Sequence, residues 1–262
     1  MKIRVGYFTH KGDRQSNEDA LLIDKELISE YGSDALASPL NETRAIVSKS
    51  FESDKALFAV ADGMGGESRG EEASFLVLNQ LLNEYERLVD EKSIISTLHR
   101  AKELLDNKVK EDSSLLNFGS TVAGILFNAN KAIIFNSGDS RVYRLSGAFL
   151  EQLSQDHTYV QSLVDEGLLN AKEVNQNPYK NILTSAIAGD LSENKPEIEI
   201  KTIELDANET FLICSDGVWE SMELEMMEAC FKQESVVECL IEEVNKSKDR
   251  DNFSVIVVEV RG

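Results

Sequence analysis

The sequence predicts an α+β protein, in which strands and helices occur in separate groups. Three short, apolar, β-branched segments follow one another at 120–127, 131–136 and 141–145, with only brief polar turns between them. Two amphipathic helices are predicted in direct succession at 73–88 and 92–110. This order differs from the strict alternation of strand and helix that is typical of a doubly wound parallel sheet. We therefore expect meandering strands with paired helices laid over a sheet.

The other elements follow from the same two patterns. The first predicted helix carries Ala73, Val77, Leu81, Tyr85 and Leu88 at spacings of four and three, which gives it one apolar face. Two more helices are predicted at 222–231 and 235–246. Further apolar or alternating segments predict strands at 3–9, 20–23, 57–61, 197–205, 210–214 and 253–260.

Two segments have less regular patterns. Residues 26–53 are polar and contain several helix and strand breakers, so the segment is either a small ordered insertion or an exposed loop. Residues 156–190 have a helical, polar pattern that Gly167 and Pro178 interrupt. His157, at the start of this pattern, is expected to begin a helix or to lie on the surface rather than bind a metal.

The sequence contains no internal repeat, low-complexity tract or linker, so one globular domain, 1–262, is expected. The formal net charge is −20, from 47 acids and 27 bases, which makes nucleic acid a poor partner. No apolar run approaches the roughly 18 residues that a membrane-spanning helix needs. The first residues alternate like a strand and lack the apolar block of a signal peptide. We expect a cytoplasmic protein that does not associate with membranes.

The three cysteines are odd in number and lack the CxxC spacing of a zinc site. Cys214, Cys230 and Cys239 are therefore expected to be thiols in the core or on a helix face. Neither structural zinc nor a disulfide framework is expected.

Four aspartates lie at or beside the end of a predicted strand. They are Asp62, Asp139, Asp216 and Asp251. Asp62 is followed by glycines at 63, 65 and 66, whose permissive backbone lets carboxylate and carbonyl oxygens converge on one point. Each Asp-Gly pair could be only a common turn. However, strand ends that are far apart in sequence can meet on one rim of a packed sheet, so the recurrence favours a cluster.

A cluster of carboxylates favours divalent cations. Two like charges about 4 Å apart repel by roughly 4 kcal/mol at an effective dielectric near 20, so such a cluster takes up protons or binds cations. Oxygen ligands suit Mg²⁺ or Mn²⁺. Two such ions would supply hydroxide near neutral pH and stabilise a transferring phosphoryl group. Arg14 offers a fork of donors for the remaining phosphate oxygens, and Glu18 lies on the same connection. This combination predicts a metal-dependent phosphohydrolase.

Other common routes to catalysis are missing from the sequence. Residues 65–70 have the outer spacing of a phosphate-binding loop, but Arg69-Gly70-Glu71 stands where Gly-Lys-Ser/Thr is required. A dinucleotide fingerprint starting at Gly63 fails because Ser68 occupies its last glycine position. There is no GxSxG or HExxH motif, and the three histidines are scattered.

At this point the motifs resemble those of the bacterial metal-dependent Ser/Thr protein phosphatases of the PPM (type 2C) family. The matching pieces span nearly the whole chain in the family's order: Arg14 with Asn17-Glu18-Asp19, Val60 to Gly66, Gly119-Ser120-Thr121, Gly138-Asp139-Ser140-Arg141, Ser215-Asp216-Gly217 and Asp251-Asn252. The resemblance implies a central antiparallel β-sandwich with antiparallel helix pairs on both outer faces. It also implies a flap at about 156–190 that affects substrate choice.

The resemblance also implies a role for each site residue. Asp62 would bridge two Mn²⁺ or Mg²⁺ ions, with the carbonyl of Gly63 on one ion and Glu18 acting mainly through water. Asp216 and Asp251 would hold the other ion, and Asp139 would contribute with Asp216 to a weaker third site. Arg14 would bind the substrate phosphate.

The family resemblance further implies a monomer that acts on phosphorylated proteins and opposes a cytoplasmic Ser/Thr kinase. Met64 stands where many eukaryotic relatives have a histidine proposed as general acid, so a water must protonate the leaving oxygen. Segment 26–53 is longer than in minimal bacterial members. Two other readings stay open: a phosphoprotein-binding module without turnover, and a purely structural metal site.

Overall fold

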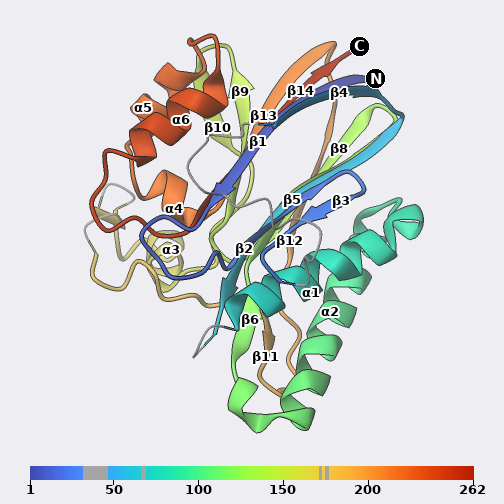
Figure 1. Cartoon of the computed structure of the whole chain (residues 1–262), viewed down its shortest axis with the longest axis vertical. Coiled ribbons are helices and arrows are strands. Elements are labelled where there is room, and N and C mark those ends of the chain that lie inside the picture. The colour runs from blue at the N-terminus through green and yellow to red at the C-terminus, as the bar shows by residue number, and fades with distance from the viewer. Residues whose placement is uncertain (32–46, 66–68, 171–172, 175–176) are drawn as a thin grey trace.

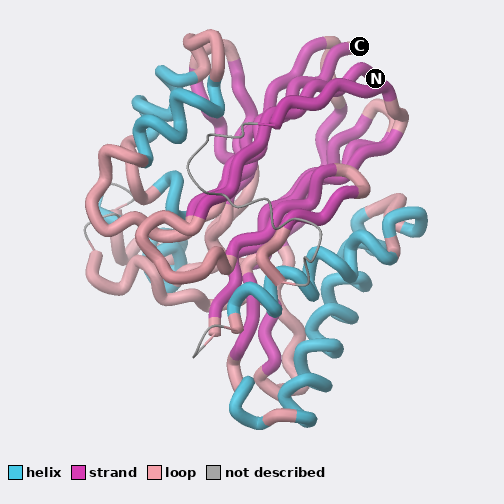
Figure 2. Tube along the Cα trace, in the orientation of Figure 1, coloured by secondary structure: helices cyan, strands magenta, loops and turns pink. Residues whose placement is uncertain are grey.

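Two antiparallel β-sheets pack face to face, and helices cover the outer face of each. The computed structural model describes residues 1–31, 47–65, 69–170, 173–174 and 177–262. Figure 1 shows the four layers, with α1 and α2 on one side of the sandwich and α5 and α6 on the other. Figure 2 shows the strands running together through the centre of the molecule. The predicted α+β class and the sandwich implied by the resemblance are confirmed.

The first sheet contains both ends of the described chain. Its strand order is β10-β9-β13-β14-β1-β4, and all its neighbouring strands are antiparallel. The strands are β1 (Lys2–His10), β4 (Val47–Glu52), β9 (Arg141–Ser146), β10 (Phe149–Gln152), β13 (Asn208–Cys214) and β14 (Phe253–Arg261). Strands β1 and β14 pair along their full lengths at the centre of this sheet.

The second sheet is built around β5, which carries Asp62 near its end. The strand order is β11-β6-β5-β7-β8-β12, and β2 pairs with both β5 and β3. The strands are β2 (Asp19–Ile23), β3 (Glu26–Ile28), β5 (Lys55–Met64), β6 (Phe118–Ser120), β7 (Val122–Asn128), β8 (Lys131–Ser137), β11 (Ile187–Gly189) and β12 (Glu199–Glu204).

The helices form one long pair and one short pair. The long pair is α1 (Gly70–Asn83) and α2 (Glu91–Glu111), and it packs on the second sheet. The side chain of Asp90 accepts a hydrogen bond from the Ser93 amide, which fixes where α2 begins. The other helices are α3 (Tyr159–Asp165), α4 (Asp216–Trp219), α5 (Leu224–Cys230) and α6 (Val236–Val244).

Three separate apolar layers hold these four layers of secondary structure together. Alternation along β5 shows how: Leu57 and Ala59 face the long helix pair, whereas Phe58 and Val60 face the first sheet. The third apolar layer lies between the first sheet and α4 to α6. Both sheets are therefore buried on both faces, which explains why their strands read as nearly continuous apolar runs.

The centre of the sandwich provides a test of packing. Phe58 is fully buried, and its ring lies 5.9 Å from that of Phe127. Phe58→Ala is expected to lower the free energy of unfolding by about 3–5 kcal/mol, because it leaves a cavity between the sheets. Urea unfolding would measure this loss. A loss below about 1 kcal/mol would contradict the described packing.

Three features differ from the sequence-based expectation. Segment 156–190, predicted to be helical, contains the short helix α3 and the strand β11 among its described residues, and the left-handed conformation of Gly167 (φ +72°) soon after α3 prevents that helix from continuing. Strand β10 was not predicted. Strands β3 and β4 lie within 26–53, so part of that segment extends the sheets, while 32–46 falls outside the described residues.

The expectation that every cysteine is a free thiol is wrong for two of them. Cys230 and Cys239 form a disulfide between α5 and α6, and Cys214 is a buried thiol in β13. A separation of nine residues carries no CxxC signature, and only the antiparallel packing of two short helices brings the two sulfurs together.

Among the described residues, the two long helices, α1 and α2, both lie beside the second sheet. Of the helices in the described ranges, none is both long and apolar enough to cross a membrane.

Candidate active site at one end of the sandwich

One cavity of about 550 Å³ collects every residue that the sequence nominated. Asp62 and Gly63 come from the end of β5, and Asp139 follows β8. Asp216 begins α4, and Asp251 lies just before β14. The connection between β1 and β2 supplies two more lining residues, Arg14 and Glu18. The predicted convergence of distant strand ends therefore occurs, although it does not by itself establish what each residue binds.

The backbone around Asp62 is fixed from two sides. The Thr121 amide donates to the Asp62 carbonyl (2.9 Å), and the Asp62 amide donates to Thr121 Oγ1 (3.2 Å). The Gly63 amide donates to the Glu18 carbonyl (3.1 Å). A Cβ atom on Gly63 would lie 2.0 Å from the carbonyl oxygen of Gly70, so only glycine allows the first turn of α1 to approach so closely.

Asn252 fastens the loop that carries Arg14 and Glu18 to the strand that follows Asp251. Its side-chain amide donates to the carbonyls of Lys11 and Ser16, both at 2.9 Å, and its Oδ1 accepts from the Glu18 amide (2.8 Å). Three hydrogen bonds from one buried side chain hold the two segments in register. Asn252 therefore lines the cavity and also positions the loop that carries Arg14 and Glu18.

Arg14 is exposed and pairs with one of the predicted ligands. Its Nη2 donates to Asp251 Oδ2 at 2.6 Å. The ion pair raises the pKa of Arg14, first through this hydrogen bond and then through the charge of Asp251. The guanidinium thus lies at the cavity mouth, beside the acids.

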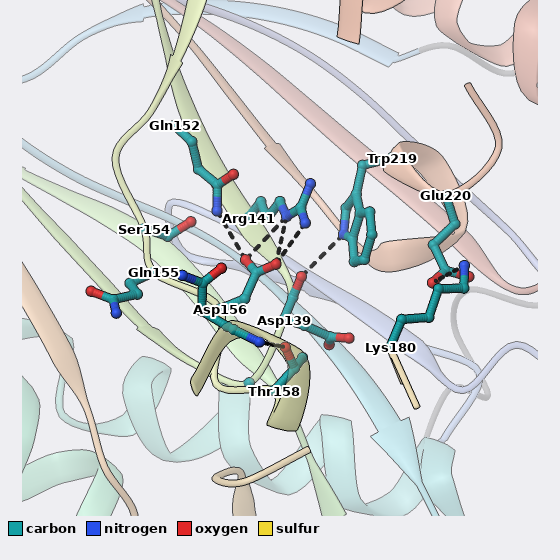
Figure 3. A network of polar contacts seen from close by, with 12 residues as sticks. Asp139, Arg141, Gln152, Ser154, Gln155, Asp156, Thr158, Lys180, Trp219 and Glu220 are labelled. Atoms are coloured by element: carbon teal, nitrogen blue, oxygen red, sulfur yellow. Dashed lines mark hydrogen bonds and ion pairs between the residues drawn. The ribbon is translucent and has the colours of Figure 1, made fainter. Parts of the chain in front are cut away.

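A polar network supports Asp139 from behind (Figure 3). The Trp219 indole donates to the Asp139 carbonyl (3.0 Å), and the Arg141 guanidinium lies 3.5 Å from the centre of the Trp219 ring. Arg141 in turn makes a bidentate pair with Asp156, with its shortest contact at 2.6 Å. Lys180 pairs with Glu220 at 2.7 Å, which links segment 156–190 to the end of α4.

His157 belongs to the support of Asp139 rather than to the cavity. It directly precedes the start of α3, as expected, but it is buried rather than superficial. Its Nδ1 accepts from the Gly138 amide (3.2 Å), and its own amide donates to the Gly138 carbonyl (2.9 Å). Gly138 adopts φ +105°, which favours glycine, so these contacts hold the turn that presents Asp139.

The clustered acids resist ionisation. Burial, and then the charges of Asp216, Asp19 and Asp139, raise the pKa of Asp62 well above its ordinary value. Burial and the charge of Asp216 do the same for Asp139. The pKa of Asp216 is raised to about 6, mainly by burial. Bringing these groups together therefore costs free energy at neutral pH unless positive charge is added.

The donor set fits hydrated divalent ions. Oδ1 of Asp216 is buried and accepts no hydrogen bond from the described residues. Within those residues, no three acidic, histidine or cysteine side chains converge tightly enough to hold one ion between them. Mg²⁺ binds through one or two carboxylates and keeps several waters, so it does not need three side chains at one point. Carboxylates, a backbone carbonyl and room for water are the appropriate ligands.

Asp19 is a residue whose importance sequence analysis missed. It is fully buried and lies directly opposite Asp62 in the pairing of β2 with β5. Its Oδ2 accepts from Ser215 (2.8 Å) and Ser254 (2.6 Å) hydroxyls, while its Oδ1 accepts no hydrogen bond from the described chain. Burial raises its pKa to about 7. The sequence does contain one indication of a buried acid here, because Asp19 is the first residue of the otherwise apolar strand β2.

Comparison with known proteins agrees with this geometry. A family model described as protein phosphatase 2C matches residues 45–248. The serine/threonine protein phosphatase PstP of Mycobacterium tuberculosis is 33% identical over 210 residues, which is 78% of this chain and 40% of PstP. The chain thus spans less than half the length of that relative. The serine/threonine phosphatase stp of Listeria monocytogenes is 27% identical over 217 residues, covering 79% of this chain and 85% of stp.

A solved structure shares the fold. The crystal structure of the PstP catalytic domain in complex with two manganese ions has a TM-score of 0.75 at 25% identity, and the match covers 100% of both chains. A four-layer sandwich with acids gathered at one end defines the class of PP2C-type folds. The chain belongs to the protein phosphatase 2C family, which is the PPM family of the resemblance.

Proposed function

We propose that this chain is a metal-dependent phosphoprotein phosphatase that hydrolyses phosphoserine and phosphothreonine. The observation that carries the proposal is the convergence of five acids from separate segments, with Arg14 beside them, on one cavity. The manganese ions of PstP and the phosphatase activity named for PstP and stp support it. The acids' raised pKa values supply the physical reason to bind cations.

The acids among the lining residues, together with the Gly63 carbonyl, would hold the ions. Asp62 would be shared between two Mn²⁺ or Mg²⁺ ions, with the Gly63 carbonyl on one of them and Glu18 reaching that ion mainly through water. Asp216 and Asp251 would hold the other ion. Asp139, together with Asp216, would form a weaker third site. When bound, the ions make hydroxide available near neutral pH and offset the charge of the phosphoryl oxygens.

The chain's own groups bind the substrate and limit how protons move. Arg14 at the cavity mouth donates to phosphate oxygens and so orients the phosphorus toward the acids. Met64 lines the cavity but has no proton to donate, so the leaving serine or threonine oxygen takes its proton from water. The flap contributes Asn181 and Leu183 to the cavity wall, where they contact the substrate near the phosphate.

The cellular setting follows from this activity. Its substrates would be phosphorylated proteins, and a Ser/Thr kinase would oppose it. We place the enzyme in the cytoplasm as a monomer, with 1–262 as one domain and with 26–53 as a possible insertion.

Hydrolysis of p-nitrophenyl phosphate and of a phosphoserine peptide tests the proposal. The protein is stripped of metal by chelation and assayed with and without added Mn²⁺. Turnover of both substrates that depends on Mn²⁺ is expected. Binding of the phosphopeptide without any metal-dependent turnover would replace the enzyme with a phosphoprotein-binding module.

Arg14→Ala is expected to raise KM about 10- to 100-fold while changing kcat much less. Hydrogen bonds to charged groups contribute about 1.5–3 kcal/mol, and the lost bonds act on the phosphate in both ground and transition states. Steady-state kinetics with p-nitrophenyl phosphate measure the effect. Arg4→Ala is the matched control, because Arg4 is an exposed arginine on β1, paired with Glu259, and lies outside the cavity lining. An unchanged KM in Arg14→Ala would remove this residue from phosphate binding.

A further inference from the structure

A second cavity opens directly beside the first one. It has a volume of about 450 Å³ and shares Met64 and Leu183 with the cavity of the acids. Its other walls come from the end of the flap (Thr184, Ser185 and Ala186), from β11 and from the loop at 190–196. The two cavities are therefore adjacent, and there is room beside Met64 and Leu183 for the part of a substrate that flanks a phosphate among the acids.

The second cavity is lined by two lysines and one acid, whereas the first cavity is lined by five acids and one arginine. Lys102 in α2, Lys195 and Asp190 are its charged lining residues. Lys102 is almost fully buried and is already matched, because its Nζ donates to Asp106 (2.7 Å) and Asp190 (2.9 Å). It also donates to the Ser192 carbonyl (3.2 Å). The Lys102 ammonium thus has no donor left for a ligand.

Lys195 is the remaining charge, and it has no ion pair with any residue in the described ranges. It is exposed at the cavity wall. Lys102 already faces two carboxylates, Asp106 and Asp190, so the charge of Lys195 brings this group to neutrality, in contrast to the clustered acids of the first cavity. The general field of the protein, with a net charge of −20, repels acidic ligands, so an exposed ammonium at the cavity wall favours that place for an acidic group.

The loop that carries Lys195 is fastened on both sides. Before it, the Leu191 amide donates to Asp106 Oδ1 of α2 (3.0 Å), and the Ser192 amide donates to Asp190 Oδ1 (2.9 Å). After it, the Glu197 amide donates to Ser185 Oγ (2.8 Å). These bonds tie residues 190–197 to α2 and to residues 184–186, so the backbone that carries Lys195 is held at the cavity wall.

We propose that the second cavity receives residues flanking the phosphoserine or phosphothreonine of the substrate, and that Lys195 selects an acidic side chain there. The inference rests on the proposed phosphatase function, since that function places the phosphate in the first cavity. Lys195 is a specificity residue and takes no part in the chemistry. The substrate class is therefore a phosphopeptide with Asp or Glu close to the phosphoresidue.

A series of phosphoserine peptides with Glu, Ala or Lys at each position near the phosphoserine tests this preference in the Mn²⁺-loaded enzyme. Glu at one position, on one side of the phosphoserine, is expected to lower KM about threefold to fivefold relative to Ala, as an exposed ion pair would. Lys195→Ala removes this preference, and Lys195→Glu turns it into a preference for Lys. Hydrolysis of p-nitrophenyl phosphate, which is too small to reach the second cavity, stays unchanged in both variants.

Lys232→Ala is the matched control, because it removes one exposed lysine that follows α5 on the opposite side of the sandwich. It should leave the peptide preference intact. The inference is wrong if the enzyme shows no preference for acidic residues at any peptide position, or if such a preference survives Lys195→Ala. In either case, hydrolysis of p-nitrophenyl phosphate would still support the proposed phosphatase function. Loss of all metal-dependent hydrolysis in the parent protein would instead refute the function itself.

Discussion

Asp62→Asn is expected to lower kcat at least about 10³-fold while making the metal-free protein more stable to heat. The shared carboxylate would be lost from both ions, and metal ions supply several kcal/mol of charge stabilisation, with 1.36 kcal/mol for each factor of ten. The stability gain has a separate cause. Asp62 lies among Asp216, Asp19 and Asp139, whose charges oppose its ionisation. A neutral amide of the same shape removes that repulsion.

Paired measurements of kcat and of Tm without metal check this expectation. Asp54→Asn makes the same chemical change at a side chain that is 99% exposed, so it should alter neither quantity. An Asp62→Asn variant with parental turnover would show that the centre lies elsewhere. A variant that is inactive because it has unfolded would contradict the repulsion argument, since its Tm would fall rather than rise.

The second large effect is a fall in the stability of the metal-free protein as pH rises. The pKa of Asp216 is about 6 and that of Asp19 about 7 in the folded protein, whereas both groups titrate near 4 when unfolded. The folded protein therefore binds more protons between about pH 4 and 7, so its stability decreases as pH rises through that window. Tm of the chelated protein should be higher at pH 5 than at pH 8.

Mn²⁺ should reverse this trend. At a free concentration of 100 times the dissociation constant, one site adds about 2.7 kcal/mol, which is about 5–11 °C for a chain of this size. The gain should be large at pH 8 and small at pH 5, because protons compete with the ion for the carboxylates. Differential scanning calorimetry at the two pH values measures both effects. Equal gains at pH 5 and pH 8, or none, would show that the acids are not the ligands.

The residues of the cavity could be predicted from the sequence because its aspartates lie at or beside the ends of predicted strands. Asp62 follows an apolar run that is typical of a buried strand, and Asp139 and Asp216 repeat that transition. The sheet topology then brings the strand ends together, which no single segment reveals. The order of the motifs along the chain indicated the family, and the family resemblance implied the β-sandwich. Periodicity alone did not determine how the strands are arranged in sheets.

What sequence reasoning missed depends on contacts between distant segments. Asp19 belongs to one of the matching motifs, but its role does not follow from the sequence, because its partners Ser215 and Ser254 lie 196 and 235 residues away. The bond between Cys230 and Cys239 depends on how two short helices pack. The 156–190 segment has helical composition, yet the left-handed conformation of Gly167 ends its helix, and later residues contact distant parts of the chain, as Lys180 contacts Glu220.

Anomalous scattering from crystals grown with Mn²⁺ tests the central idea, that acids from distant strand ends hold paired ions, more directly than kinetics does. Two strong peaks are predicted in the cavity, both next to the Asp62 carboxylate, with Asp216 and Asp251 beside one of them. Both peaks should weaken or vanish in crystals of Asp62→Asn. A cavity without manganese, at a concentration that supports full turnover, would contradict the account.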